Sequence, residues 1–432
     1  MKKLLFLILA IVALMGCSSD SKGNDRDDGE MVIDMLPKTR SIVLTQEQRA
    51  FVGKNTDFSF NLFRAISQMP EGKKSSIISP ISVTYVLGML NDGASGNTAK
   101  EITSVVGFGE GKTLAVNEFC RRLIDEAPET DPSVTLEIAN IVIGNNYRHV
   151  DFEPQYKWDM QDYYRAEITN FDFSQKTETL AEVNGWCYDK THGMIPEILN
   201  ETELKADALL LLMNAIYFKA TWTDKFDPDD TRDKTFTTES GQTQSRPMMH
   251  RKAGAEYSEN DVCTMLNLPY GSGDKWSMKV LLPREGKTVD DVINSLNAES
   301  WQALRHNSWY PVIDIEMPRF KTSFETDLKQ PLSGMGAPTM FTPGAAEFPN
   351  ICSNYKQDFY VFLMKQKAAI EVDEEGTKAS AVTVAGLVDS AGGPWGIEKP
   401  LNVDFHANRP FVYVIQEASS GVIFFLGTYR GE

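Results

Sequence analysis

Seven apolar runs constrain the fold of this chain more than any other feature of its sequence. Each run is four to eleven residues long and rich in Val, Ile, Leu or Phe, which is typical of buried strands. They cover residues 136–143, 208–218, 278–282, 312–317, 359–364, 411–415 and 423–426. Helical periodicity lies earlier, at 51–69 and 80–90, with Asn55 and Asp57 as candidate caps. Helices in the first half and strands in the second predict an α+β fold with large sheets.

The composition argues against several classes of function. Lys and Arg number 43 against 60 Asp and Glu, and the resulting net charge of −17 disfavours binding to nucleic-acid phosphates. The five histidines include no pair spaced as in the zinc-binding HExxH helix, and the five cysteines include no CxxC pair. We therefore predict no metal site, and nothing in the sequence indicates a cofactor.

Residues 1–16 are typical of an export signal. Two lysines precede an apolar run at 4–14 that is too short to span a bilayer permanently, and the run leads into Gly16-Cys17. A small residue followed by Cys resembles the bacterial lipobox, in which Cys17 becomes a lipidated N-terminus. An ordinary secretory signal is the alternative. We expect an outer-membrane lipoprotein, exposed either to the periplasm or at the cell surface, with this lipid as its only membrane attachment.

Residues 17–40 form a predicted tether, because they are rich in acidic and small polar residues and have few apolar side chains to bury. From about residue 46 onward there is no repeat, low-complexity tract or second linker. The remaining length exceeds that of an average domain, so length alone favours a division into more than one domain. Four cysteines follow Cys17, and their wide spacing leaves both buried thiols and two disulfides open. They are Cys120, Cys187, Cys263 and Cys352.

Patterns that suggest an enzyme are present but incomplete. The serine-hydrolase pattern S-x-x-K occurs at Ser272–Lys275 and again at 353–356, in both cases without its companion motifs. A Gly-Lys-Thr at 111–113 lacks the first glycine of a phosphate-binding P-loop, because that position is Val106. No G-x-S-x-G nucleophile elbow is present. We therefore predict that the chain is not an enzyme.

Residues 371–396 carry the most unusual pattern in the chain. From Thr377 to Ala385 every second residue is small, while the interleaved positions are Lys378, Ser380, Val382 and Val384. Successive side chains of a strand point to opposite faces, so this stretch predicts a strand whose small face can slide over a packed core. Gly376 supplies the backbone freedom of a hinge in front of it. A small-residue strand followed by a surface loop is the simpler interpretation.

The hinge resembles that of the serpins, a family of inhibitors of serine and some cysteine proteases. Glu374, Glu375, Gly376 and Thr377, with Ala379, Ser380, Ala381 and Thr383 after them, carry this resemblance. Further blocks similar to that family lie in the same order at 79–82, 93–98, 184–195, 214–222, 317–328 and 408–427. The resemblance implies one domain over 41–432, with three β-sheets, eight or nine helices and an exposed reactive-centre loop at about 376–400.

The resemblance also implies a mechanism and a set of functional residues. A protease would attack the loop and form an acyl-enzyme, and the cleaved loop would enter the large sheet as a new strand. Family spacing places the reactive bond between Ser390 and Ala391, within a range of 385–392. Trp222 would lie at the breach, where the loop enters. A buried polar cluster under the sheet opening would contain Ser79, Ser82, Asn214 and Gln366, with Gln366 where many members carry His.

Two features of this mechanism can be derived from the residues themselves. A charged or bulky side chain on the entering face would have to be buried. The resemblance implies in addition that the hinge lies outside the sheet before cleavage. No Arg or Lys occurs from 379 to 398, which disfavours a trypsin-like protease and favours an elastase-like target. We expect a monomer. The alternative is a non-inhibitory serpin-fold binding protein on the cell envelope, which would need no insertable hinge.

Overall fold

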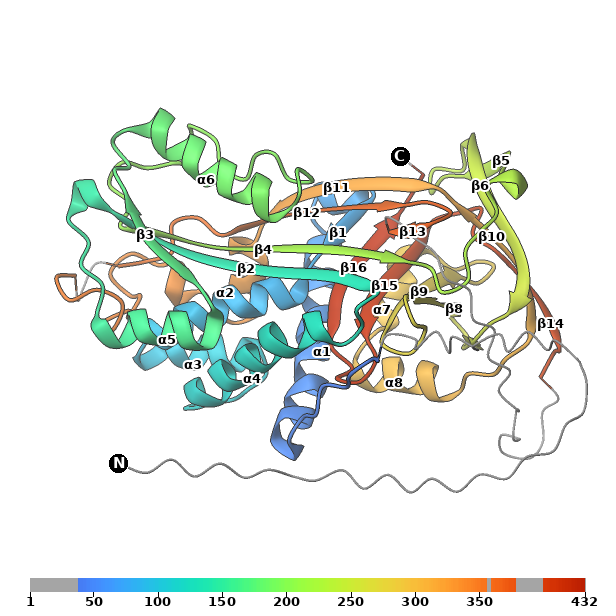
Figure 1. Cartoon of the computed structure of the whole chain (residues 1–432), viewed down its shortest axis with the longest axis horizontal. Coiled ribbons are helices and arrows are strands. Elements are labelled where there is room, and N and C mark those ends of the chain that lie inside the picture. The colour runs from blue at the N-terminus through green and yellow to red at the C-terminus, as the bar shows by residue number, and fades with distance from the viewer. Residues whose placement is uncertain (1–37, 356–358, 378–398, 432) are drawn as a thin grey trace, which may run out of the picture. The chain divides into compact units, whose positions relative to one another are not determined.

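Nine α-helices and sixteen strands occur in the residues that the computed structural model describes, which are 38–355, 359–377 and 399–431. The first six helices precede residue 191, and long strands dominate the rest of the chain (Figure 1). The helices are α1 (Gln46–Ser67), α2 (Pro80–Gly93), α3 (Gly96–Val105), α4 (Thr113–Glu126), α5 (Pro154–Tyr164), α6 (Lys176–Lys190), α7 (Val289–Ser295), α8 (Ala298–His306) and α9 (Lys329–Gly334). This distribution confirms the predicted α+β class.

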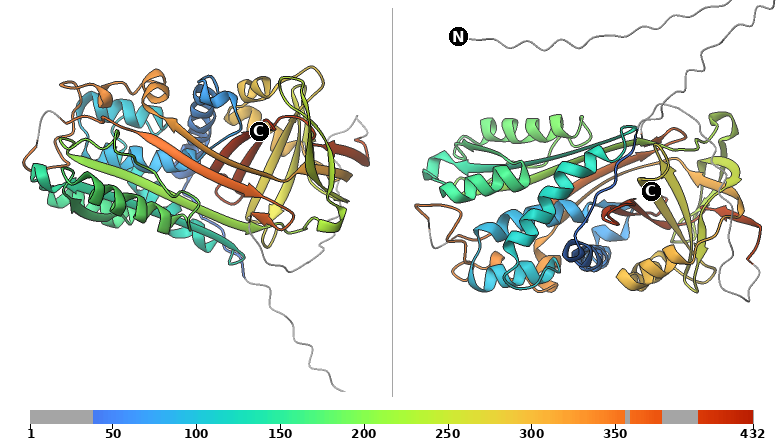
Figure 2. Two further views of the ribbon diagram at one scale, coloured as in Figure 1. Left: turned by 90° about the horizontal axis from the view of Figure 1, so that it is seen from above. Right: turned by 60° about the horizontal axis from the view of Figure 1, so that its bottom comes forward.

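The strands of the described residues form four hydrogen-bonded sheets, and we call two of them, which lie side by side without pairing, the divided sheet (Figure 2). The six-stranded sheet has the order β1 (Ser76–Ile78), β16 (Ile423–Tyr429), β15 (Phe411–Glu417), β9 (Trp276–Pro283), β8 (Cys263–Tyr270), β7 (Tyr257–Glu259). A four-stranded sheet has the order β14 (Asn402–His406), β10 (Val312–Pro318), β6 (Thr243–Gly254), β5 (Arg232–Thr237). The divided sheet consists of β13 (Gly376–Thr377), β4 (Leu210–Thr221), β2 (Val134–Asn145) and β3 (Glu167–Phe171), with β11 (Phe320–Asp327) and β12 (Lys365–Val372) as a separate pair.

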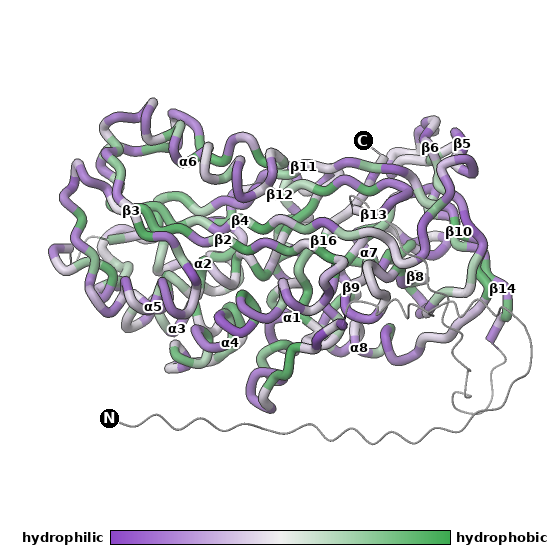
Figure 3. The backbone as a smooth tube through the Cα atoms, viewed as in Figure 1, coloured by the Kyte–Doolittle hydropathy of each residue, from purple (hydrophilic) through white to green (hydrophobic). Residues whose placement is uncertain are grey.

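The two faces of the divided sheet are covered by different helices. Figure 1 shows α6 over one face and α2 against the opposite face, and hydrophobic residues are concentrated in the long strands between them (Figure 3). On the α2 side, Phe218 of β4 packs against Trp276 and Phe425 of the six-stranded sheet. On the α6 side, Leu211 packs in a smaller apolar cluster with Leu180 of α6. Both faces of β4 are therefore apolar, as its continuous hydrophobic run predicts.

Helix α1 starts five residues earlier than its apolar periodicity predicts. Thr45 caps it, and the side chains of Thr45 and Gln48 complete a reciprocal capping box. Asn55 and Asp57, the candidate caps, lie inside the helix instead. The Asn55 amide donates to Thr84 Oγ1, and Asp57 accepts from the backbone N–H of Ala298. Both side chains serve tertiary contacts, which local sequence cannot distinguish from capping.

The predicted strand at 359–364 is wrong. The strand in this part of the chain is β12, which begins at Lys365 and shows alternating burial. The apolar run before it is irregular but packed, since Phe359 contacts Phe348 and the N–H of Val361 donates to the Met340 carbonyl. Only Phe359 and Met364 of the run are buried, and Tyr360 is exposed. The true strand alternates between buried and partly exposed residues, and its polar side chains hide this period of two from a search for apolar runs.

Among the described residues, no helix combines the length and the hydrophobicity needed to cross a bilayer.

Candidate functional site: the opening in the divided sheet

The divided sheet is open between β4 and β12. Among the described strands, β12 pairs with β11, and β4 pairs with β2 and β13, but β4 and β12 do not pair with each other. A cavity of about 720 Å³ lies along this opening and is lined by most of β4 and β12, with side chains of α2 below. Figure 2 shows β11 and β12 running beside β4. Unpaired strand edges present rows of N–H and C=O groups that can template a further strand.

Strand β13 already occupies one end of the opening. The chain turns back after β12, where the Asp373 and Gly376 backbones hydrogen-bond to each other. Gly376 then pairs with Thr221, and Thr377 with Ala220, in antiparallel register. The expectation that the hinge lies outside the sheet is therefore wrong for these two residues.

Glycine is the only residue type that fits at position 376, where the chain turns into β13. Its φ of +129° lies in a region that L side chains rarely adopt. A Cβ at this position would lie 2.5 Å from the carbonyl oxygen of Ala220 and 2.6 Å from the nitrogen of Trp222. The close approach of two backbones explains physically why the hinge carries glycine here.

Aromatic side chains hold the entrance to the opening. Trp222 stacks on Tyr270 with ring centroids 4.5 Å apart, and its indole N–H donates to the Asp373 carbonyl over 2.9 Å. The Tyr270 hydroxyl lies 3.2 Å from Thr377 Oγ1, and Thr377 is buried. Thr377 therefore faces the core, the direction expected for the small set that begins with it.

Glu374 is buried beside the turn in a charged contact. Arg319 Nε lies 2.6 Å from both carboxylate oxygens of Glu374, and Thr231 also donates to it. Burial alone would raise the pKa of Glu374, but the hydrogen bonds from Arg319 and Thr231 outweigh it and hold the pKa below its ordinary value. Glu375 forms an ion pair with Lys225 on the outer side. These contacts fix the base of the hinge.

Replacing Glu374 with Gln should remove stability at neutral pH and change the acid limb of the unfolding profile. A depressed pKa stabilises the fold above the ordinary value of 4.5, and this stability is lost as the pH falls through the lower folded pKa. Because Arg319 is 44% exposed, we expect a loss of only about 1–2 kcal/mol at pH 7, which shrinks as the pH falls from 4.5 through the lowered folded pKa of Glu374. Urea unfolding across this range measures it.

Glu371→Gln is the matched control for this prediction. Glu371 lies in β12 and pairs with Lys321, whose side chain is 71% exposed, so its contribution should be small at every pH. Equal losses for the two variants at pH 7, or a Glu374→Gln loss that does not shrink as the pH is lowered below 4.5, would contradict the role assigned to Glu374.

Three of the four residues predicted for the buried polar cluster are joined by hydrogen bonds. Gln366 Nε2 donates to the Ser79 carbonyl over 2.8 Å, and Gln366 Oε1 accepts from the Ser79 N–H over 3.0 Å. The Ser82 hydroxyl donates to Ser79 Oγ over 3.0 Å. Gln366 thereby links β12 to the start of α2 with a side chain that does not titrate.

Asn214, the fourth residue, has different hydrogen-bond partners. It lines the same cavity, but its amide donates to Asn140 Oδ1 on β2 over 2.9 Å and to the Ala139 carbonyl. Its own Oδ1 atom is buried without a partner among the described residues. The four side chains thus share one cavity without forming one network.

Other predicted site residues lie outside the described part of the chain. These are Cys17, the later hinge residues Ala379, Ser380, Ala381 and Thr383, and the reactive pair Ser390 and Ala391. Of the rejected hydrolase pair, Ser272 donates to Asp131, whereas Lys275 pairs with Asp274. Lys275 therefore does not activate Ser272 here.

Two residues that contact the hinge, Arg319 and Tyr270, were not identified from the sequence. Arg319 belongs to a recognised block at 317–328 but was not assigned to Glu374, which lies 55 residues later. Tyr270 ends a strand of another sheet, and nothing in its local sequence indicates contact with Thr377. The only available signal was charge: Glu374 is a hinge carboxylate that needed a cationic partner once buried.

The family model described as "Serpin (serine protease inhibitor)" matches residues 53–430. The chain is a serpin. An uncharacterised serpin-like protein of Methanosarcina acetivorans is 28% identical over 99% of this chain and 96% of its own length. Among solved structures, the thermophilic serpin tengpin in its native state matches with a TM-score of 0.77 and 26% identity, covering 92% of this serpin and 97% of tengpin. Thyroxine-binding globulin in complex with thyroxine gives 0.75 and 25%, covering 87% and 98%.

Proposed function

We propose that this serpin inhibits serine endopeptidases, and some cysteine endopeptidases, by inserting its cleaved loop between β4 and β12. The observation that carries the proposal is β13, which is the first two residues of a strand already seated in an otherwise open sheet. Continuing that strand would satisfy the facing edges of β4 and β12 with backbone hydrogen bonds. The cavity along the opening is the space into which it would extend.

The register of β13 predicts the register of the inserted strand. Thr377 pairs with Ala220, so continued antiparallel pairing would place Ala379 opposite Phe218 and Thr383 opposite Asn214. The end of β4 at Leu210 would be reached by Leu387. Eleven residues, 377–387, therefore match the available length of β4, and three more precede the predicted reactive bond.

The alternating small residues and the residues between them would each face a different side of the sheet, and each set suits the side that it would face. Positions 379, 381, 383 and 385 would face the core side, where Phe218 packs against Tyr270 and Trp276 and where a charged side chain would have to be buried. Thr383 could donate a hydrogen bond to the unpartnered Asn214 Oδ1. Val384 would lie opposite Met213, which packs on the apolar cluster beneath α6. A valine on that face would bury apolar surface, which stabilises the inserted strand.

Insertion turns an ordinary cleavage into a trap. The protease nucleophile attacks the carbonyl carbon of the reactive residue, proposed to be Ser390, and the amine of Ala391 leaves. Residues before the bond then remain esterified to the enzyme. Inserting 378–387 would carry the ester along the sheet and away from the site where the protease first bound. Trapping succeeds if insertion is faster than hydrolysis of the ester.

The experiment that tests this function is incubation with a panel of purified proteases followed by a denaturing gel. We expect a covalent band, with a mass equal to the protease plus the serpin less its C-terminal fragment, from an elastase-like enzyme and none from trypsin. Clean cleavage by every protease, without a covalent band, would overturn the inhibitory function.

A non-inhibitory binding function is the second candidate. It is favoured by the similarity to thyroxine-binding globulin, whose solved complex contains thyroxine. In that case the loop would be cut without trapping the protease, and the fold would serve to hold a ligand. The same gel distinguishes the two functions.

The export signal supports a location for this activity. We propose that Cys17 carries a lipid and that residues 18–40 tether the serpin to the outer membrane, where it would meet proteases of a host or of competing bacteria. Cys17→Ser should move the protein from the detergent phase to the aqueous phase in a Triton X-114 partition. A Ser18→Ala variant, which leaves the cysteine intact, should stay in the detergent phase. Equal partitioning of both variants would contradict lipidation.

A further inference from the structure

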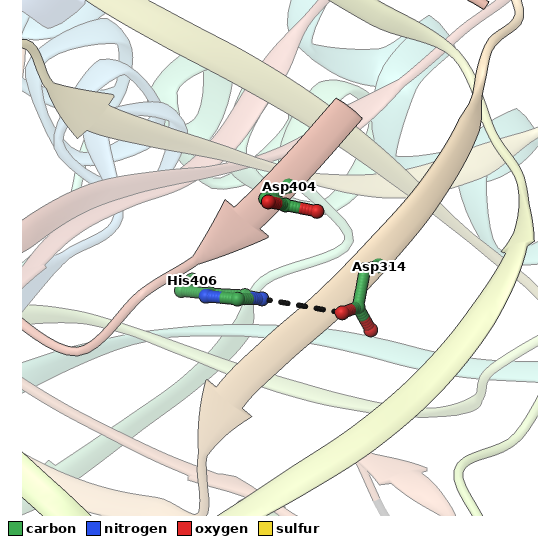
Figure 4. A group of neighbouring side chains, drawn as sticks. All are labelled: Asp314, Asp404 and His406. Carbon is green, nitrogen blue, oxygen red and sulfur yellow. Dashed lines mark ion pairs between the residues drawn. The ribbon is translucent and has the colours of Figure 1, made fainter. Parts of the chain in front are cut away.

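Three side chains that are candidate metal ligands meet on the four-stranded sheet, away from the opening. Asp314 lies on β10, and Asp404 and His406 lie on the adjacent parallel strand β14 (Figure 4). Asp314 and Asp404 are direct register partners, and His406 points to the same face two residues further on. One ligand atom from each residue lies within 4.8 Å of the other two. The proposed function uses none of these residues.

The distance between His406 and Asp314 fits a shared metal ion better than a direct hydrogen bond. His406 Nε2 lies 3.6 Å from Asp314 Oδ2, which is too long for a hydrogen bond. Two ligand atoms on a tetrahedral zinc ion, each about 2.0–2.1 Å from it, lie roughly 3.4 Å apart. His406 Nε2 is also a buried atom with no hydrogen-bond partner among the described residues. A metal ion would be the partner that this nitrogen lacks.

A second histidine orients the central carboxylate. His250 of β6 lies with its Nε2 2.6 Å from Asp314 Oδ1, the oxygen on the other side from His406. Carboxylates that bind metals are typically held in this way by an outer hydrogen bond. In the described ranges, neither Asp314 nor Asp404 forms an ion pair with Lys or Arg, although Lys252 of β6 is the register partner of Asp314; the ion pairs of Asp314 are with His250 and His406. Their negative charge is available to a cation.

We propose that Asp314, Asp404 and His406 bind one divalent transition-metal ion of the zinc class, with His250 orienting Asp314. Imidazole nitrogen favours zinc and its neighbours over magnesium and calcium, which prefer oxygen alone. Three protein ligands leave one coordination position to water. The side chains of His406 and Asp314 are each about one-third exposed and Asp404 is exposed, so the site lies at the protein surface although His406 Nε2 itself is covered.

The ion would join an edge strand to the sheet. Among the described strands β14 pairs with β10 alone, and it is the first strand after the predicted reactive-centre loop. A metal bridge between Asp314 and the two β14 ligands adds a second connection besides the backbone ladder. It would hold the C-terminal end of the loop in place whether or not the chain inhibits proteases.

Zinc titration by calorimetry tests the site, with one ion bound per chain as the expected result. His406→Ala and Asp404→Asn should each weaken zinc binding by more than about 100-fold, and His250→Gln by about tenfold. Zinc should also slow amide hydrogen exchange in β14. His192→Ala is the matched control, because His192 contacts the single carboxylate Glu137 at 3.1 Å on another sheet.

The control variant should bind zinc as the unmodified chain does. The proposal is overturned if the unmodified chain binds no zinc, if His406→Ala and Asp404→Asn bind it normally, or if exchange in β14 is unchanged by the ion. Far-UV circular dichroism of each variant shows whether it folds. None of these outcomes depends on inhibition of a protease.

Discussion

Cleavage of the chain between residues 385 and 392 should raise its melting temperature by more than about 10 °C. The freed segment would extend β13 along the opening, gaining backbone hydrogen bonds to β4 and β12 at ~1 kcal/mol each and filling the cavity of about 720 Å³. Ordering the segment opposes this by on the order of 1–2 kcal/mol per residue. Closure of the divided sheet over its core decides the sign of the net change. In a folded unit of this length each net kcal/mol shifts the melting temperature by ~1 °C, so the expected rise corresponds to a net gain of roughly 10 kcal/mol.

The measurement is a pair of melting curves, before and after nicking by a protease that cuts the loop without being trapped. Cleavage in the acidic tether at 17–40 is the control, since it breaks a peptide bond without releasing a strand. A nicked form that melts at the same temperature as the intact chain, or lower, would contradict insertion.

Ala381→Arg should convert the proposed inhibitor into a substrate. The predicted register places residue 381 opposite Ile216 on the core side of β4, so insertion would bury a guanidinium in the cavity. A barrier higher by only about 1.4 kcal/mol slows insertion tenfold, and hydrolysis of the ester then wins. The number of serpin molecules consumed per protease inactivated should rise at least tenfold. Thr377→Arg is a poorer test, because Thr377 is already buried in the intact fold.

Lys378→Arg is the matched control for Ala381→Arg. It places a guanidinium on the opposite face of the same strand without changing the charge, and its predicted partner Lys219 is only partly buried. We expect its stoichiometry of inhibition to equal that of the unmodified chain. If Ala381→Arg also leaves the stoichiometry unchanged, the small face does not enter the sheet.

The strand runs and the hinge could be predicted from sequence because each depends on a short-range pattern. Continuous apolar runs predicted the strands that the structure shows as β2, β4, β15 and β16. The need for glycine at residue 376 follows from its backbone conformation. Six of the seven runs contain strands. The exception, 359–364, packs irregularly, with only its two end residues buried, because apolar packing and strand formation are separate properties that one hydrophobic signal cannot distinguish.

Features that depend on long-range contacts could not be predicted in the same way. Arg319 meets Glu374 only because β11 and β12 fold side by side, and Gln366 meets Ser79 across 287 residues. The partial seating of β13 depends on how far β4 and β12 stand apart, which no local pattern encodes. The Asp314, Asp404 and His406 cluster likewise has no sequence spacing of a metal motif, and it forms only through pairing of β10 with β14.

The structure of the chain nicked between 385 and 392 tests loop insertion most directly. The predicted result is one continuous strand from residue 376 to about 387 lying between β4 and β12. Thr383 would lie opposite Asn214, and the cavity would be filled. A nicked structure in which β13 still ends at Thr377 and the opening between β4 and β12 remains would contradict the proposed mechanism.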